Sequence, residues 1–377
     1  MTETYDGGHA AVAKAESVPN PFYISATTSI LERRPRTLKY GDTFAVFDHC
    51  GDVSSRGGSP EGVFHKDTRF LSELRILLNG QRPLLLSSTV QDNNALLTVD
   101  LTNPDLFTAG NLELARDTIQ IGRSKFLFEG ACYERLGVHN FGSDAHTLEF
   151  MFHFAADFAD IFELRGHRRE RRGKIETRVD ENGVVFLYHG LDGVIRRTTI
   201  QFDPKPEAID EESARFVMKL DPGGRASLFT TIACEERPHE ASPVRQFFIG
   251  LRDARRAMHA LTARAASVET SNDIFNEVLC RSVADLYMLM TNTGRGIIPY
   301  AGIPWFSTAF GRDAIITAIE MLWLDSTVAE GVLRFLAATQ ATEVRRDAEA
   351  EPGKILHEMR SGEMARLGEV PFACYYG

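Results

Sequence analysis

The chain contains 377 residues, of which 43% are hydrophobic and 25% are charged, and its formal net charge is −10 at pH 7. This is the composition of an ordinary globular protein with room for about two or three domains. The acidic balance argues against nonspecific nucleic-acid binding, which depends on positive surface. The lack of any run of about 18 apolar residues argues against a membrane span.

The five cysteines are widely scattered and show no CxxC spacing. That pattern indicates free thiols in a reducing compartment rather than a disulfide framework or a zinc site. The N-terminal sequence MTETYDGGHAAVAKAE has no basic segment followed by an apolar core, so it does not predict a signal peptide. We therefore expect a cytoplasmic protein that requires no metal and no cofactor.

The first part of the chain divides into a tail and a region of strands. Residues 1–36 are mostly small and polar and predict a flexible tail. Residues 37–240 contain ten or more short runs of β-branched and large apolar residues, separated by turn formers. Asn79-Gly80, between two such runs, predicts a β-hairpin. Because no strong helical segment separates the strands, we expect antiparallel pairing and a large β-sandwich domain.

From about Pro243 onward, the sequence pattern is typical of helices. Residues 241–268 predict a linker helix, and residues 269–377 predict several helices of similar length. Helical spacing predicts buried faces on three segments that follow the linker. These faces are Ile274, Val278, Val283, Leu286, Tyr287 and Met290; then Ile315, Ile316, Ile319, Leu322 and Trp323; then Val328, Val332, Phe335 and Leu336. A short helix is expected around residues 362–367.

A basic run, RGHRRERRGK, interrupts the β-rich region at residues 165–174. A basic loop of this kind can hold a phosphate group, but short basic runs are common on protein surfaces. The interpretation that we favour is a solvated hairpin tip between two β runs.

The stretch GIPWFSTAFGRD, residues 302–313, combines aromatic and charged residues at the start of a predicted helix. Asp313 suits the first turn, where the helix dipole favours negative charge, whereas Arg312 does not. Sugar rings stack their apolar faces on aromatic rings such as Trp305 and Phe306, and sugar hydroxyls bind carboxylates and guanidinium groups. The stretch therefore fits a sugar subsite. A buried aromatic cluster with a structural ion pair fits the residues as well.

The segment EAEPGKILHEMRSGEM, residues 349–364, is dense in ionisable groups around Ile355 and Leu356. It lacks the second histidine of an HExxH zinc motif, so a metal site is not indicated. Glu358 and Glu363 have the chemistry of paired carboxylates for acid–base work, and salt-bridged loop residues are the alternative.

Together these strings resemble bacterial and archaeal glycogen-debranching enzymes of the amylo-α-1,6-glucosidase type. PWFSTAFGRD and EPGKILHE match in order and spacing, and EGVFHKDTRFLSEL and DFADIFELRG resemble the β-rich domain that precedes the catalytic domain in that family. The resemblance covers residue 37 to the end. It implies a fold with an N-terminal antiparallel β-sandwich followed by the first helices of an (α/α)₆ toroid.

The resemblance also implies roles for particular residues. Trp305 and Phe306 would wall the pocket for a terminal glucose, and Arg312 and Asp313 would bind its hydroxyls. His357 and Glu358, with Lys354 nearby, would come from a neighbouring loop on the same rim. In such enzymes the acidic catalytic residues lie after the position that corresponds to Gly377, so the catalytic carboxylates are expected beyond this sequence.

The function implied is hydrolysis of α-1,6-glucosidic branch points in glycogen or a related α-glucan by an inverting two-carboxylate mechanism. We expect this chain to be a truncated form that does not catalyse the reaction by itself. Two alternatives stay open. The β region is a carbohydrate-binding or partner-docking module, with a second polypeptide completing the toroid, or the toroid acts on another glycoside.

Overall fold

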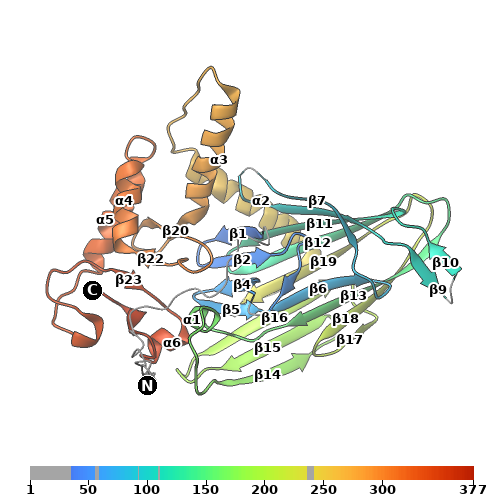
Figure 1. The fold of residues 1–377 in the computed structure, drawn as a ribbon, viewed down its shortest axis with the longest axis horizontal. Helices are drawn as coiled ribbons and strands as arrows, with labels where there is room; N and C mark the ends of the chain where they lie inside the picture. The colour runs from blue at the N-terminus through green and yellow to red at the C-terminus, as the bar shows by residue number, and fades with distance from the viewer. Residues whose placement is uncertain (1–34, 56–58, 92, 109–110, 236–241) are drawn as a thin grey trace, which may run out of the picture.

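The computed structural model describes residues 35–55, 59–91, 93–108, 111–235 and 242–377. The predicted flexible tail, residues 1–36, lies almost entirely outside this part of the chain. In the described part, long strands occupy one side of the molecule and helices occupy the other (Figure 1).

Two large antiparallel sheets form a sandwich, as the sequence predicts. The larger sheet contains, in spatial order, β14 (Lys174–Val179), β15 (Gly183–His189), β16 (Ile195–Asp203), β19 (Arg225–Cys234), β12 (Ala131–Asn140), β11 (Ile119–Phe128), β8 (Leu97–Thr102) and β7 (Leu84–Val90). The smaller sheet contains β17 (Ala208–Ile209), β18 (Ser213–Leu220), β13 (His146–Ala155), β6 (Glu73–Leu78) and β3 (Val53–Ser54). Alternating side chains of both sheets fill the space between them.

Smaller sheets surround the sandwich. One contains β1 (Arg36–Tyr40), β2 (Thr43–Phe47), β4 (Gly62–His65) and β5 (Thr68–Leu71), and another contains β9 (Leu106–Thr108) and β10 (Asn111–Leu114). The helical side adds two short ladders, formed by β20 (Met290–Asn292) with β21 (Ile297–Pro299) and by β22 (Ala309–Phe310) with β23 (Glu358–Met359).

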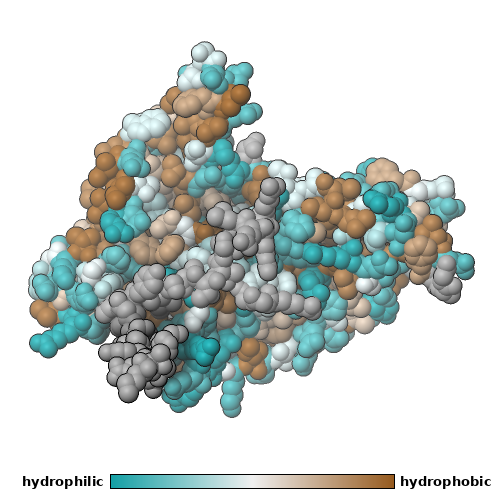
Figure 2. Space-filling model, viewed as in Figure 1, coloured by the Kyte–Doolittle hydropathy of each residue, from teal (hydrophilic) through white to brown (hydrophobic). Residues whose placement is uncertain are grey.

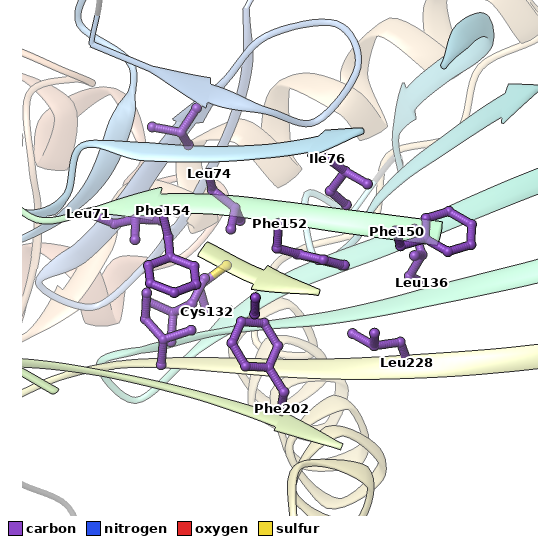
Figure 3. Close-up of a cluster of buried hydrophobic side chains, with 14 of the residues drawn as sticks. Leu71, Leu74, Ile76, Cys132, Leu136, Phe150, Phe152, Phe154, Phe202 and Leu228 are labelled. Atoms are coloured by element: carbon purple, nitrogen blue, oxygen red, sulfur yellow. The ribbon is translucent and has the colours of Figure 1, made fainter. Parts of the chain in front are cut away.

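Period-two alternation builds the sandwich core. In β13, Phe150, Phe152 and Phe154 are buried and their neighbours are partly exposed. Figure 3 shows these phenylalanines between the sheets, near Phe202 and Leu136 of the larger sheet. Because each sheet covers the inner face of the other, these side chains leave water completely.

The Asn79-Gly80 turn forms, but it does not make a hairpin. Both residues have positive φ, 46° and 75°, and Leu78 and Gln81 exchange backbone hydrogen bonds across the turn. However, β6 lies in the smaller sheet and β7 in the larger one. The turn therefore carries the chain from one sheet to the other, which local sequence does not reveal.

Six helices lie in the described residues: α1 (Ile161–Leu164), α2 (Pro243–Thr262), α3 (Asp273–Leu289), α4 (Gly311–Glu320), α5 (Ser326–Ala338) and α6 (Glu363–Arg366). Two 3₁₀ turns, η3 (Arg346–Ala348) and η4 (Pro371–Ala373), complete the C-terminal segment. None of the helices in this part of the chain has both the length and the apolar character to cross a membrane.

Helix α2 packs on the outer face of the larger sheet. Phe247 lies with its ring centroid 5.2 Å from that of Phe126 on β11 and 5.5 Å from that of Phe229 on β19. The linker segment is thus anchored on the sandwich rather than extended between two regions.

The prediction of a buried face is confirmed for α5 and is wrong for parts of α3 and α4. On α5, Val328, Val332, Phe335 and Leu336 are buried. Ile274 and Val278 on α3 are exposed, and so are the outer residues of α4 and its following turn: Ile316, Ile319, Leu322 and Trp323. The buried side of α4 consists of Gly311, Ala314 and Ala318, where small residues allow close contact with α5. Figure 2 shows the resulting hydrophobic surface over the helical side.

A third cluster joins the sandwich side to the C-terminal segment. Phe44, Val46 and Phe64 of the four-stranded sheet pack with Phe162 of α1 and with a set of residues from the helical side. That set is Trp305, Met364, Ala365, Val370, Phe372 and Tyr375. The helical side therefore rests on the β-rich side through an apolar contact.

Candidate functional site

The two predicted sugar-binding motifs lie side by side. Phe310 of β22 pairs with Glu358 of β23 in an antiparallel ladder, and the Gly311 N–H donates to the His357 carbonyl at 3.0 Å. A side chain at position 311 would collide with the carbonyl oxygen of Leu356, so only glycine allows this contact. The glycine thus fixes the start of α4 against the loop that carries His357 and Glu358.

A pocket of about 600 Å³ opens where these segments meet. Its lining includes Phe306, Arg312, Asp313, His357 and Glu358. The structure therefore brings these predicted residues together, although the two strings are separated by about 45 residues of sequence. Pockets of this size with an apolar wall and a few convergent polar groups are typical of small-molecule sites.

Arg312 and Asp313 form an exposed pair in the first turn of α4. Their closest charged atoms, Arg312 Nε and Asp313 Oδ2, are 3.8 Å apart, and the side chains are 73% and 43% exposed. Asp313 lies where the helix dipole favours a carboxylate. Because water reaches both groups, the pair contributes little to stability, and a ligand can displace that water.

Glu358 is held by a buried ion-pair chain that begins in the β-rich side. Arg360 donates to Glu358 Oε1 at 2.6 Å and to Asp67 Oδ1 at 2.8 Å. Asp67, in the turn between β4 and β5, also accepts the Ser361 backbone N–H at 2.9 Å. Since Arg360 and Asp67 are almost fully buried, this chain fixes the position of the Glu358 carboxylate at the pocket wall.

Aromatic rings complete the wall around His357. The imidazole lies edge-on to Phe310, with centroids 6.2 Å apart, and to Tyr375, with centroids 5.6 Å apart. The Arg165 guanidinium lies 5.4 Å from the centroid of the Phe306 ring, and Arg165 lines the same pocket. Phe306 itself is about half exposed and faces a potential ligand.

Two predicted residues do not line this pocket. Trp305 is buried in the apolar contact between the two sides of the molecule, and its carbonyl accepts a hydrogen bond from Arg360 at 2.8 Å. Lys354 donates to the Glu349 carbonyl at 2.8 Å and stabilises the preceding turn. In this structure Trp305 supports the pocket from behind, and Lys354 acts within its own loop.

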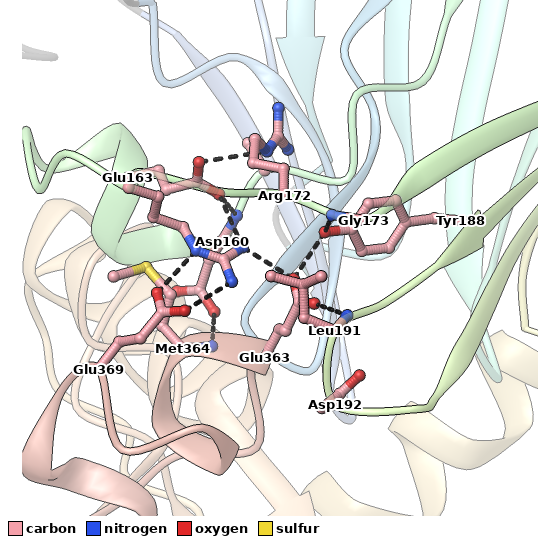
Figure 4. Close-up of polar contacts among 12 residues, drawn as sticks. Asp160, Glu163, Arg172, Gly173, Tyr188, Leu191, Asp192, Glu363, Met364 and Glu369 are labelled. Carbon is pink, nitrogen blue, oxygen red and sulfur yellow. Dashed lines mark hydrogen bonds and ion pairs between the residues drawn. The ribbon is translucent and has the colours of Figure 1, made fainter.

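The basic run contributes to the same region in a way that its sequence does not show. The Arg169 side chain is only 1% exposed and pairs with Glu363 at 2.8 Å and with Glu369 at 2.7 Å. The run connects α1 to β14, so the interpretation as a solvated tip is wrong for Arg169. Glu363 also accepts hydrogen bonds from the Tyr188 hydroxyl at 2.7 Å and from the Leu191 N–H (Figure 4). Glu363 is therefore a structural residue rather than a partner of Glu358 in acid–base work.

Burial changes the pKa values of the carboxyl groups in this network. Burial, together with the nearby Asp67, raises the pKa of Asp160 to about 7, although the backbone N–H groups of Phe162 and Met364 oppose the shift. Burial also acts to raise the pKa of Glu363, but the hydrogen bonds from Tyr188 and Arg169 outweigh it and lower that pKa. Glu363 thus stays ionised and holds Arg169.

Sequence reasoning did not identify Arg165, Phe310, Tyr375 or Arg360 as residues of the site. Phe310 and Arg360 stand inside or next to the recognised strings, so their position was a usable signal. Arg165 comes from a loop far away in sequence, and no local pattern points to it. In the described part of the chain no group of three or more histidine, cysteine or acidic residues is arranged to hold a metal ion.

The fold defines a class: a β-sandwich followed by the first helices of an (α/α)₆ toroid. Several solved structures share the fold, and two of them serve as examples. One is described as "Putative kojibiose phosphorylase from human microbiome", with 9% identity and a TM-score of 0.57 over 81% of this chain and 46% of that chain. The other is a bacterial glucoamylase complexed with acarbose, with 10% identity and a TM-score of 0.52 over 85% of this chain and 52% of that chain. Such low identities show the fold alone, and this chain spans about half the length of each structure.

The family is identified by a match of residues 38–231 to the N-terminal domain of (some) glycogen debranching enzymes. The chain belongs to this family, which confirms the resemblance seen in the sequence. No curated protein matches the chain.

Proposed function

We propose that the pocket between α4 and the loop around Glu358 binds a terminal glucose unit of glycogen or a related α-glucan. In this proposal the chain is the substrate-holding part of a debranching enzyme that hydrolyses α-1,6-glucosidic branch points. The observation that carries the proposal is the convergence of Phe306, Arg312, Asp313, His357 and Glu358 on one pocket. These groups supply an apolar wall, a guanidinium and two carboxylates, which suit the two faces of a sugar ring and its hydroxyls.

We assign Asp313 and Glu358 to binding rather than to proton transfer. Inverting hydrolysis needs a carboxylic acid and a carboxylate base about 6.5–9.5 Å apart, on opposite sides of the bond that breaks. Glu358 Oε1 accepts a hydrogen bond from the buried Arg360 at 2.6 Å, which fixes this carboxylate at the pocket wall as an acceptor for sugar hydroxyls. We therefore propose that the catalytic carboxylates lie outside residues 1–377. This chain alone is then expected to bind glucan without releasing glucose, and glucose release by this chain alone would contradict the assignment.

The proposal also divides the chain. Residues 37–240 form the β-sandwich domain, residues 241–268 the linker helix, and residues 269–377 the part of the toroid that holds the sugar. The packing of α2 on the larger sheet supports a linker that belongs structurally to the sandwich. The exposed apolar residues of α3 and α4 support a toroid whose remaining helices, or a second polypeptide, cover them.

Isothermal titration with maltotriose and with an isomaltose-ended oligosaccharide tests the binding role. In Asp313→Asn we expect affinity to fall about tenfold, or ~1.4 kcal/mol. The stability of the same variant should change by less than ~1 kcal/mol, because the pair is exposed. Asp253→Asn is a matched control, since Asp253 also follows an arginine on a helix and pairs with it at the surface. A stability loss in Asp313→Asn with unchanged affinity for both oligosaccharides would contradict the proposal.

A second candidate is a toroid glycosidase that acts on another linkage. Two of the solved structures that share this fold are described as a putative kojibiose phosphorylase and as a glucoamylase, and these two names differ from that of a debranching enzyme. Titration with kojibiose, maltose and isomaltose in parallel distinguishes the candidates. The debranching proposal predicts that the isomaltose-ended ligand binds more tightly than kojibiose.

A further inference from the structure

The outer face of the larger sheet changes character along its strands. Near one end, Phe126, Tyr133 and Phe229 are covered by Phe247 of α2. Further along the same face, the period-two positions become Ser124, Gly122 and Gln120 on β11. Here the sheet is open and forms a pocket of about 520 Å³ that β8, β11, β12 and β19 all line.

The floor of this pocket has no side chains at its centre. Gly122 and Gly137 are register partners on β11 and β12, and Asp100 and Ser227 flank them on β8 and β19. Glycine in the middle of a strand weakens the sheet and often marks a position that a ligand or another backbone approaches closely. A Cβ at these two positions would meet no atom closer than 3.5 Å. Packing within the protein therefore does not require glycine at either position.

Aromatic and polar groups surround the glycine floor. Phe141 is 64% exposed, and its ring centroid lies 3.9 Å from that of His139. Arg135 donates to the Ser227 hydroxyl at 3.0 Å, and Gln120 donates to Asp100 at 3.4 Å. Arg225 adds a second guanidinium to the lining.

This set of groups suits a neutral polyhydroxylated ligand. The guanidinium and amide groups donate hydrogen bonds, and the carboxylate and hydroxyl groups accept them. A phosphate needs donors alone, and Asp100 would repel it. An exposed phenyl ring beside a flat floor provides a surface for the apolar face of a sugar ring.

We propose that this pocket, the sheet groove, is a second carbohydrate-binding site, separate from the pocket at α4. It holds a chain segment of a neutral oligosaccharide against the Gly122–Gly137 floor, with Phe141 as the stacking ring. That the oligosaccharide is an α-glucan rests on the proposed function. Such a site would keep the protein on a polymer while the pocket at α4 engages a chain end.

Affinity electrophoresis in gels that contain glycogen, and titration with maltoheptaose and with cellohexaose, test the sheet groove. All variants carry Asp313→Asn, so that the pocket at α4 contributes little. We expect Phe141→Ala and Gly137→Val each to weaken binding about tenfold, or ~1.4 kcal/mol. Valine favours strands, so Gly137→Val should fold at least as well as the parent, and it fills the floor. Phe107→Ala is the control, because Phe107 on β9 is as exposed as Phe141 but does not line the groove.

The outcomes separate the two proposals. Binding of maltoheptaose that Phe141→Ala and Gly137→Val both weaken supports the groove and the α-glucan assignment. The same pattern with cellohexaose alone supports the groove and contradicts the α-glucan assignment. If neither sugar binds in the Asp313→Asn background, or if both groove variants bind as the Phe107→Ala control does, the groove proposal is wrong.

Discussion

On β13 of the sandwich, Phe150, Phe152 and Phe154 are all at most 1% exposed, whereas Ile319 on α4 is 62% exposed and Ile274 on α3 is 74% exposed. Both sets of residues stand at regular spacing within strongly apolar segments. The difference lies in what faces them. Each sheet of the sandwich covers the other, but α4 and α5 cover one another on one side only. Regular apolar spacing thus predicts a face that can be buried, and the number of neighbouring elements decides whether it is.

The largest expected effect concerns two buried phenylalanines, one in the core of the sandwich and one in the core of the helical side. Phe152→Ala in the sandwich and Phe335→Ala in the helical side both remove a buried ring, and each should cost ~3–5 kcal/mol locally. Trp323 lies on the helical side and Trp305 in its contact with the β-rich side, so tryptophan fluorescence reports on the helical side and on that contact during urea unfolding. We expect Phe335→Ala to shift the fluorescence transition much more than the loss of β-sheet circular dichroism. Equal shifts of both signals in both variants would mean that the two sides unfold as one unit.

The second prediction concerns a variant that breaks the ion-pair chain between the two sides of the molecule. Arg360→Met leaves Glu358 and Asp67 buried without their cation, which should cost ~3–5 kcal/mol. It should also weaken sugar binding at the α4 pocket, because Glu358 loses its fixed position. Arg334→Met is the control, since Arg334 forms an exposed pair with Glu330 and its loss should cost less than ~0.5 kcal/mol. Urea unfolding and titration with maltotriose measure the two effects. If Arg360→Met is as mild as the control, the chain does not connect the two sides.

The third prediction uses pH to probe the contact between β1 and the end of α3. Lys39 is buried and donates to the Thr291 hydroxyl at 2.7 Å, with the Tyr300 ring 4.8 Å away. Burial lowers the pKa of Lys39 from 10.5 to about 7, although Asp42 opposes the shift. The folded protein therefore binds fewer protons than the unfolded chain between these values. The free energy of unfolding increases as pH rises from about 7 to about 10, and this gain is lost again as pH falls back to about 7.

The slope from this single group is at most about 1.4 kcal/mol per pH unit. Lys39→Met should remove that slope in urea unfolding between about pH 7 and pH 9. This window lies below the range in which Tyr300 and Tyr287, whose pKa values are raised by burial and by neighbouring carboxylates, would lose protons. Identical pH profiles for the parent and Lys39→Met would show that Lys39 does not titrate in this way.

The smallest expected effect concerns the exposed apolar surface of the helical side. Ile319→Lys and Trp323→Gln should change stability by less than ~0.5 kcal/mol, because both side chains are mostly exposed. They should reduce self-association and the binding of a hydrophobic dye. The same type of change at Val332, which is buried between α4 and α5, should instead unfold the helical side. A large stability loss in Ile319→Lys would show that this face is already covered.

Local patterns were enough to predict much of the architecture. Alternation with period two predicted the strands of the sandwich, and helical spacing predicted α2 to α5, because both depend on the chain's own geometry. The Asn79-Gly80 turn was also predicted, but the assignment of β6 and β7 to different sheets was not. That assignment depends on which other strands β6 and β7 pair with, and the sequence of the turn does not encode this pairing.

The candidate site shows the same division. The strings around Arg312 and His357 identified five of the residues that line the α4 pocket, since each string carries its own chemistry. Arg165 and Asp67 come from the β-rich side, and only folding brings Arg165 to the pocket and Asp67 to the Arg360–Glu358 pair. Arg169 resembled a surface cation because its acidic partners Glu363 and Glu369 lie almost 200 residues further on.

The sequence by itself determined the two kinds of secondary structure, the motifs of the pocket and the family. Tertiary structure alone decided that Trp305 supports the pocket from behind, that Arg169 is buried, and that two mid-strand glycines become the floor of a groove. The physical reason is that alternation, propensity and motif chemistry act between near neighbours, whereas burial and ion pairing depend on which distant segments meet.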